Sequence, residues 1–237
     1  MDLNGKKLIL ASASPRRREL LAGLDLDFEV DTRNNFIERY EPGTPHREIP
    51  AVLSRGKSEG FHRPLADNEI LLSSDTLVLC GEEVMGKPQG REDALRMLRL
   101  LSDGWHEVIT AVTVRSNSYS KTLSDVAKVH FKALTDSELE YYVDKYRPFD
   151  KAGAYGIQEW IGYIGIDRIE GSFYTIMGLP VHLVHELLSE AVLLHGRGSV
   201  LTPVPRERPR GCSDSGFQGV TLGITAGFSP ESPSGLP

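Results

Sequence analysis

The sequence has few cysteines, no long apolar run and no excess of positive charge. Its two cysteines, Cys80 and Cys212, stand far apart in unlike contexts, which excludes a disulfide framework and a cysteine-based zinc site. No window approaches 18 uncharged apolar residues, so no transmembrane helix is expected. The apolar stretch Leu8–Ser12 is too short for a secretory signal, and we therefore expect a cytoplasmic protein without a membrane partner.

The charge balance argues against a nucleic-acid binder. The 237 residues carry a formal net charge of -6, whereas affinity for nucleic acid depends on a large basic surface. A small local basic pocket remains compatible with this balance.

The composition changes after Leu188. Residues 189–237 are 49 residues, of which 21 are Gly, Pro or Ser, with four Arg against four acidic residues. Such a segment buries too little apolar surface to offset the entropy of ordering it. We predict one folded unit over residues 1–188 and a flexible tail over 189–237, or at most a short helical extension. The basic run Pro205–Arg210 is a weaker candidate for a docking motif.

The first 188 residues alternate strand-like and helix-like segments, which indicates an α/β unit. A hairpin around Ser116–Ser118 implies a mixed sheet flanked by helices rather than a purely parallel one. The expected strands are Lys7–Ala11, Asp27–Val30, Ile70–Ser74 continuing as Leu77–Cys80, Glu107–Arg115, Ser124–Lys132 and a β-rich stretch Ile161–Ile169. The expected helices begin at Pro15, Pro50, Arg91 and Pro180, and after a capping box at Thr135–Glu138.

Two segments have unusual chemistry for their predicted positions. Ser12–Arg18 lies at a strand-to-helix junction, where backbone N–H groups attract anions, so the serines and arginines there favour a phosphate cradle over solvated arginines. Asp75 follows an apolar strand, where a carboxylate can hold a metal or activate water. Taken alone, an aspartate at this position is better explained by a turn between two strands.

Four further segments are weak alone, since each also fits an ordinary helix face or loop. They are Leu53–Lys57, Gly86–Pro88, Asp150–Gln158, and Glu170–Phe173 followed by Met177–Pro180. Taken together with Ser12–Arg17, Ser74–Val78 and His106–Thr110, in this order, they resemble the Maf family of nucleotide pyrophosphatases. The resemblance spans roughly residues 7 to 188. The version at Asp150–Gln158 resembles the subgroup acting on dTTP and UTP, rather than the sister subgroup that prefers 7-methyl-GTP or related nucleotides.

The resemblance implies a hydrolase that cleaves a nucleoside triphosphate between the α and β phosphates. It also implies a central cleft between two lobes, a divalent cation (Mg²⁺ or Mn²⁺), and compatibility with a homodimer. By this resemblance, Asp75 is the general base and shares the metal with Glu38. The phosphates are bound by five residues: Ser12, Arg16, Arg17, Lys57 and Lys87. Arg16, Thr76 and Gln158 match positions that read the base. Gln158 can pair with a pyrimidine edge through both its donor and its acceptor.

Three alternatives stay open at this point. The same chemistry could act on another nucleotide, such as a 7-methyl-GTP-like or modified one. The chain could be a nucleotide-binding regulator, for instance of cell division. A nucleic-acid binder working through Arg16–Arg18 and the arginines of the tail is the weakest, because the overall charge is acidic.

Overall fold

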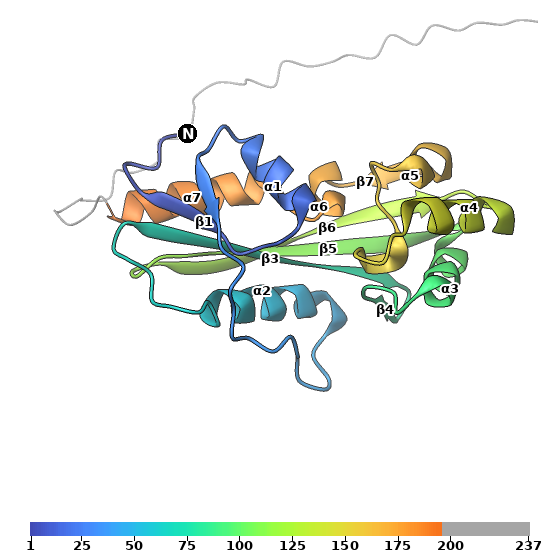
Figure 1. Ribbon diagram of the computed structural model, residues 1–237, viewed down its shortest axis with the longest axis horizontal. Helices are drawn as coiled ribbons and strands as arrows, with labels where there is room; N and C mark the ends of the chain where they lie inside the picture. Colours follow the sequence, from blue (N-terminus) through green and yellow to red (C-terminus); the bar gives the residue numbers. More distant parts are fainter. Residues whose placement is uncertain (196–237) are drawn as a thin grey trace, which may run out of the picture. The chain divides into compact units, whose positions relative to one another are not determined.

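A mixed sheet forms the centre of the computed structural model, which describes residues 1–195 (Figure 1). Its strands lie in the order β2-β1-β3-β5-β6-β7, and β4 pairs with β3. The β1–β2 and β1–β3 pairs are parallel and the others are antiparallel, which confirms the predicted mixed α/β sheet. The strands are β1 Lys7–Leu10, β2 Phe28–Val30, β3 Glu69–Cys80, β4 Glu83–Met85, β5 Gly104–Arg115, β6 Ser120–Phe131 and β7 Ile166–Glu170.

Helices cover both faces of this sheet. Figure 1 shows α1, α6 and α7 on one side and α2 on the other. The larger core lies on the first side, where leucines of α1, α3 and α7 pack with Leu72 and Val112; the smaller one packs Ile49 and Leu53 of α2 against Leu77. The helices are α1 Pro15–Ala22, α2 Ile49–Glu59, α3 Arg91–Leu101, α4 Asp136–Tyr146, α5 Trp160–Gly165, α6 Phe173–Met177 and α7 Val181–His195, with 3-10 turns at His46–Glu48 and Ala152–Ala154.

Local sequence signals place most of these elements. The helix predicted over Arg91–Leu101 is confirmed, and the capping box at Thr135 and Glu138 is formed at the start of α4. The stretch Ile161–Ile169 was expected to be β-rich, and this is wrong for its first half, which forms α5. Ile161 is fully buried, and Gly162 lies so close to the Ile157 carbonyl that a Cβ would sit 1.8 Å from its oxygen. The apolar composition of this stretch therefore indicates that it is buried, not that it is a strand. The close approach of Gly162 to the Ile157 carbonyl favours the helical turn.

Strand β3 does not end before Asp75. The sequence analysis placed an interruption at Asp75–Thr76, but the strand runs through these residues because β5 pairs with it continuously from Leu71 to Leu79. On its other side β3 pairs with β1 up to Leu72 and with β4 only from Val78. Within the described residues, Ser73–Leu77 therefore have no strand neighbour on that side. We call these five positions the edge gap.

Helix α7 continues past Leu188 to His195, which corresponds to the short helical extension that the sequence analysis allowed. Ala191 and Val192 are buried, so the apolar face of the helix extends past that boundary. The tail predicted beyond it, including Pro205–Arg210, lies almost entirely outside the described residues. Over residues 1–195, no helix is both long and apolar enough to cross a membrane.

Candidate active site

A cleft of about 770 Å³ opens at the edge gap. Side chains alternate along β3, so Asp75 shares the face of Leu77 and points toward α2, whereas Thr76 shares the face of Val78 and the larger core. The cleft therefore collects groups from both faces of the sheet. It brings together every residue that the sequence analysis proposed for the site: Ser12, Arg16, Arg17, Glu38, Lys57, Asp75, Thr76, Lys87 and Gln158.

Two carboxylates of the cleft share one ammonium group. The Nζ of Lys57, on α2, lies 2.5 Å from Oδ1 of Asp75 and 3.0 Å from Oε1 of Glu38. The side chains of Lys57 and Asp75 are 19% and 13% exposed, while that of Glu38 is 60% exposed. The Lys57–Asp75 pair is thus fixed in a partly buried position, and Glu38 closes on it from the solvent side.

Gly56, in α2, allows the loop that carries Glu38 to pack closely on the helix. A Cβ on Gly56 would lie 2.3 Å from Cζ of Phe36, so the ring packs directly on the helix backbone. The side chain of Asn34 donates to the carbonyl of Lys57 at 2.5 Å and accepts from the Phe36 N–H at 2.7 Å. A glycine inside a helix costs roughly 1 kcal/mol relative to alanine. Here it permits the close approach that places Glu38 beside Lys57.

Arg17 is part of the wall of the cleft. Its Nε donates to the Gly178 carbonyl at 2.8 Å, its Nη1 to the Ser74 carbonyl at 2.7 Å, and its Nη2 to Oγ1 of Thr76 at 3.1 Å. Burial lowers the pKa of Arg17, with the nearby Asp75 opposing that shift. Because the Ser74 carbonyl belongs to the edge gap, the guanidinium replaces the missing strand neighbour. The sequence analysis expected Arg17 to bind substrate, but three of its N–H directions serve the protein itself.

The start of α1 is built as predicted. Ser14 caps the helix by accepting from the Arg17 N–H at 3.4 Å, and Pro15 occupies the first helical position. The Oγ of Ser12 accepts from the Ser14 N–H at 3.3 Å. Arg16 contacts Oδ2 of Asp150 at 3.4 Å. Arg16 lines the cleft, and no other hydrogen bond of its guanidinium is found over residues 1–195.

Lys87 is the least constrained cation of the cleft. It follows β4, and no hydrogen bond or ion pair involving its Nζ is found over residues 1–195. A flexible ammonium group of this kind can adapt to an incoming anion.

Gln158 ends a loop that is held in place by buried ion pairs and hydrogen bonds. The buried Lys151 contacts Oδ1 of Asp150 at 2.8 Å and Oε1 of Glu159 at 3.1 Å. The hydroxyl of Tyr142 donates to Glu159 and accepts from the Gly156 N–H at 3.0 Å, and burial beside Glu159 raises its pKa. Gln158 lines the cleft, and its buried Oε1 has no hydrogen-bond partner among the described residues, so one acceptor of this residue is unused.

The sequence analysis missed the support beneath Thr76. Thr110 lies directly opposite it on β5, and their Oγ1 atoms are 3.0 Å apart. Thr110 in turn donates to the carbonyl of Thr175 at 2.8 Å. Strand alternation over Glu107–Arg115 could have placed Thr110 on the Thr76 face, but the contact with Thr175 spans 65 residues and leaves no local signal.

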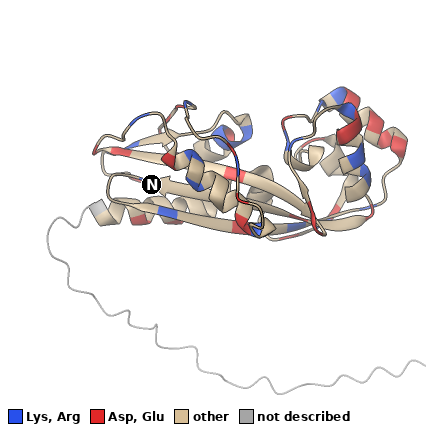
Figure 2. Ribbon diagram, turned by 90° about the horizontal axis from the view of Figure 1, so that it is seen from below, with Lys and Arg blue, Asp and Glu red and all other residues tan. Residues whose placement is uncertain are grey.

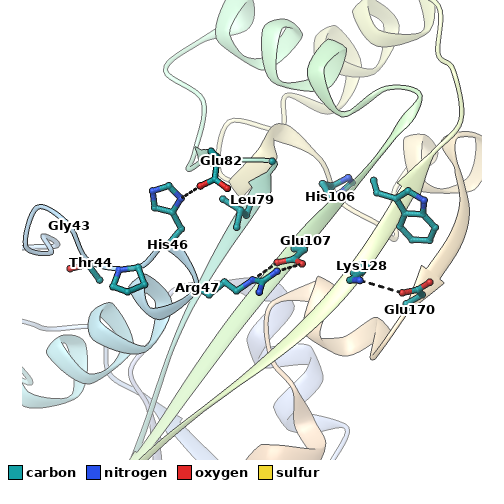
Figure 3. Close-up of a pocket in the computed structure, with 13 residues that line it drawn as sticks. Gly43, Thr44, His46, Arg47, Leu79, Glu82, His106, Glu107, Lys128 and Glu170 are labelled. Atoms are coloured by element: carbon teal, nitrogen blue, oxygen red, sulfur yellow. Dashed lines mark hydrogen bonds and ion pairs between the residues drawn. The ribbon is translucent and has the colours of Figure 1, made fainter.

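A second hollow, of about 1000 Å³, lies over β5, β6 and β7 beside the His46–Glu48 turn (Figure 3). We call it the Trp105 pocket, after the aromatic residue in its wall. Its charged side chains are paired with each other: Arg47 with Glu107, Lys128 with Glu170, and His46 with Glu82. No sequence signal pointed to it.

Charges of both signs are interspersed along the described elements (Figure 2), and the cleft itself is lined by four cationic side chains and three carboxylates. The molecule is thus an α/β protein with a mixed sheet and a polar cleft at an internal strand edge. A family model described as "Maf-like protein" matches residues 7–191, and the chain belongs to the Maf family.

Similar proteins carry one common name, dTTP/UTP pyrophosphatase. That of Parabacteroides distasonis is 48% identical over 187 residues, which are 79% of this chain and 97% of the relative. A protein of Porphyromonas gingivalis is 45% identical over 191 residues, covering 80% and 96% of the two chains. A protein of Bacteroides thetaiotaomicron is 45% identical over 184 residues, covering 78% and 95%.

Proposed function

We propose that this chain is a nucleoside triphosphate pyrophosphatase that hydrolyses dTTP and UTP to the monophosphate and pyrophosphate. The observation that carries the proposal is the convergence of Asp75, Lys57 and Glu38 in a cleft that also holds Arg16 and Lys87. The names of its similar relatives support the same substrates.

Asp75 is the proposed general base. Its carboxylate takes a proton from a water molecule as that water attacks the α-phosphorus. A new P–O bond forms there, and the bond to the bridging oxygen breaks as pyrophosphate leaves. Lys57 keeps the carboxylate oriented, since its Nζ lies 2.5 Å from Oδ1 of Asp75. A positioned general base contributes about 10²- to 10⁴-fold to the rate.

The cations of the cleft bind the triphosphate. A nucleoside triphosphate carries about four negative charges near neutral pH, so its hydrolysis depends mainly on positioning and charge neutralisation. In this proposal Arg16 and Lys87 contact the phosphates, and Ser12 with the start of α1 adds neutral donors. Arg17 contributes its positive field from the wall of the cleft.

The donor set fits a divalent cation held jointly with substrate. No group of three or more His, Cys, Asp or Glu side chains in residues 1–195 forms a ready-made metal site. Mg²⁺, however, is commonly bound through one or two carboxylates together with substrate phosphates and water. Glu38 and Asp75 would supply those carboxylates for Mg²⁺ or Mn²⁺. When bound, the cation would neutralise phosphate charge.

The base end of the nucleotide lies against Thr76 and Gln158. Both line the cleft, and the buried Oε1 of Gln158 has no partner among the described residues. Arg16 can reach the same region from α1. The proposal includes action on free nucleotides in the cytoplasm. The folded unit predicted over residues 1–188, together with its helical extension, carries the reaction. A homodimer is compatible with this proposal.

A nucleotide panel with and without metal tests this function. The purified full chain is given dTTP, UTP, CTP, GTP and 7-methyl-GTP, with Mg²⁺, Mn²⁺ or a chelator, and both products are measured. We expect monophosphate and pyrophosphate from dTTP and UTP, with little turnover under chelation. Equal or faster turnover of the guanine nucleotides would overturn the substrate assignment. Tight nucleotide binding without turnover would favour a regulator.

A further inference from the structure

We propose that the buried Thr110, which donates to the backbone carbonyl of Thr175, fixes the direction in which the Thr76 hydroxyl donates, so that Thr76 meets a nucleobase only as a hydrogen-bond acceptor. Such an acceptor suits the N3–H of uracil and thymine and opposes the N3 lone pair of cytosine. This inference rests on the proposed function, which it extends from a substrate class to a means of selection.

The direction of each hydrogen bond follows from donor counting. A backbone carbonyl only accepts, so the bond of 2.8 Å from Oγ1 of Thr110 to the Thr175 oxygen uses the one hydrogen of Thr110. The bond of 3.0 Å between Oγ1 of Thr76 and Oγ1 of Thr110 must then be donated by Thr76. The hydrogen of Thr76 therefore points into the protein, away from the cleft.

Arg17 reinforces this direction. Its Nη2 donates to Oγ1 of Thr76 at 3.1 Å, and a guanidinium cannot act as acceptor. A hydroxyl has one hydrogen and two lone pairs. With the hydrogen and one lone pair used inside the protein, one lone pair of Thr76 remains for a ligand. Arg17 cannot rotate away easily, because its other N–H groups hold the carbonyls of Ser74 and Gly178.

The hydrogen bonds that run from Thr76 through Thr110 to the carbonyl of Thr175 are shielded from the solvent. Thr110 and Thr175 are fully buried, and neither lines the cleft, so water does not replace these hydrogen bonds. The hydroxyl of Thr175 is itself held, since it donates to Asp125. The register of β3 and β5 places Thr76 and Thr110 directly opposite each other on one face of the sheet. The arrangement is therefore part of the rigid sheet.

The neighbourhood of Thr76 suits a base better than a phosphate. The lining residues from Ala152–Gln158 and from Ile176–Gly178 are all neutral, and the guanidinium that contacts Thr76, that of Arg17, is already bound to the carbonyls of Ser74 and Gly178. Lys57, Asp75 and Glu38 meet on the opposite face of β3. A flat ring with a polar edge fits the neutral side. When a buried acceptor such as the Thr76 oxygen faces another lone pair, it is left without a hydrogen bond. The free-energy cost of this strongly disfavours binding of the wrong ligand.

The test is the ratio of kcat/KM for UTP to that for CTP, measured on the full chain and on T110V. Valine keeps the volume and removes the acceptor for the Thr76 hydrogen, so that Thr76 becomes free to donate to the N3 of cytosine. We expect the wild-type ratio to be about 100 and to fall by at least about tenfold in T110V. T110S, which keeps the hydroxyl, should retain the ratio.

T113V is the matched control. Thr113 is equally buried on β5, but its hydroxyl contacts Ser54 and Thr122 on the other side of the sheet. It should lose similar stability and keep the wild-type ratio. An unchanged ratio in T110V, or an equal fall in T113V, would overturn the inference, whereas a wild-type enzyme that ignores UTP would overturn the proposed function instead.

A measurement on the unmodified chain covers the case in which T110V does not fold. N3-methyl-UTP lacks the donor at position 3, and 5-methyl-UTP carries the same added methyl group elsewhere. We expect kcat/KM for the N3-methyl nucleotide to be at least about tenfold below that for the 5-methyl nucleotide. Equal values would show that no acceptor reads this position.

Discussion

The cleft and the Trp105 pocket both contain acidic and basic side chains, but they pair them differently. In the Trp105 pocket each base has its own acid: Arg47 contacts Glu107 through two bonds of 2.8 and 2.6 Å, and Lys128 lies 3.9 Å from Glu170. In the cleft, Lys57 is shared by two carboxylates, and Lys87 has no ion-pair partner among residues 1–195.

This difference indicates which hollow is built for an anion. An acid paired one-to-one with a base leaves little field for a ligand, and exposed pairs of this kind contribute only about 0–1 kcal/mol to stability. Size would have pointed the other way, since the Trp105 pocket has about 1000 Å³ against about 770 Å³ for the cleft. The arrangement of charges, not the volume, distinguishes the candidate active site.

The largest expected effect comes from replacing Asp75, one of the two carboxylates that contact Lys57. D75N should lower kcat for dTTP by about 10³-fold, because the amide cannot take a proton from water. Pyrophosphate release measures it. The matched control in the other hollow is E107Q, which should retain wild-type kcat. Full turnover by D75N would remove Asp75 from its role as base.

Removal of the Lys57 ammonium group, which Asp75 and Glu38 share, should have the next largest effect. K57M leaves Asp75 and Glu38 side by side without the ammonium group, and we expect kcat/KM to fall by about 10²-fold. K128M makes the same change in the Trp105 pocket and should leave kcat/KM unaltered. If the two variants lose activity equally, the contrast between the hollows has no functional meaning.

Lys87 should give a smaller effect that falls on binding. K87A should raise KM for dTTP about tenfold with kcat little changed, because one charge-assisted hydrogen bond to a phosphate is lost. K132A, which removes an exposed lysine outside both hollows, serves as the control. A purely kcat effect of K87A would instead place the ammonium at the reacting phosphate.

The smallest effect concerns stability and the floor of the Trp105 pocket. Burial lowers the pKa of His106 to about 3 from 6.5, so between these values the unfolded chain takes up a proton that the folded chain does not. The fold should therefore lose stability as the pH falls below about 6.5, by up to about 1.4 kcal/mol per pH unit. Urea unfolding at pH 7 and pH 5.5 measures this.

The control for His106 is H106Q, which can keep the hydrogen bond to the Tyr155 hydroxyl, 2.8 Å long in the wild type, without titrating. Its free energy of unfolding should change less between the two pH values. Activity at pH 7 should stay as in the wild type, since His106 does not line the cleft. Parallel pH profiles for the two proteins would contradict the assignment.

Local signals predicted much of the fold because they act over a few residues. The capping box at Thr135 and the prolines at Pro15 and Pro50 define helix starts without help from the rest of the chain. The continuity of β3 could not be predicted in this way. Its polar centre is stable in a strand only because β5 pairs with it throughout.

The sequence predicted which residues gather in the cleft, but not the contacts that hold them there. The resemblance to the Maf family brought Asp75, Lys57 and Gln158 into one proposal, and all three line the cleft. Their partners depend on contacts between distant segments, as when Arg17 reaches the carbonyl of Gly178, 161 residues away. Nothing in the sequence around Arg17 could reveal that its donors face the protein.

The edge gap also bears on solubility. An uncovered strand edge is a template for another chain, and proteins restrict such edges by keeping them short or placing charge beside them. Here the uncovered stretch is confined to Ser73–Leu77 between β1 and β4, and Arg17 already holds the carbonyl of Ser74. An invading strand would have to displace a buried guanidinium before it could pair. The chain can thus keep an open backbone edge inside its candidate active site with little risk of self-association through it.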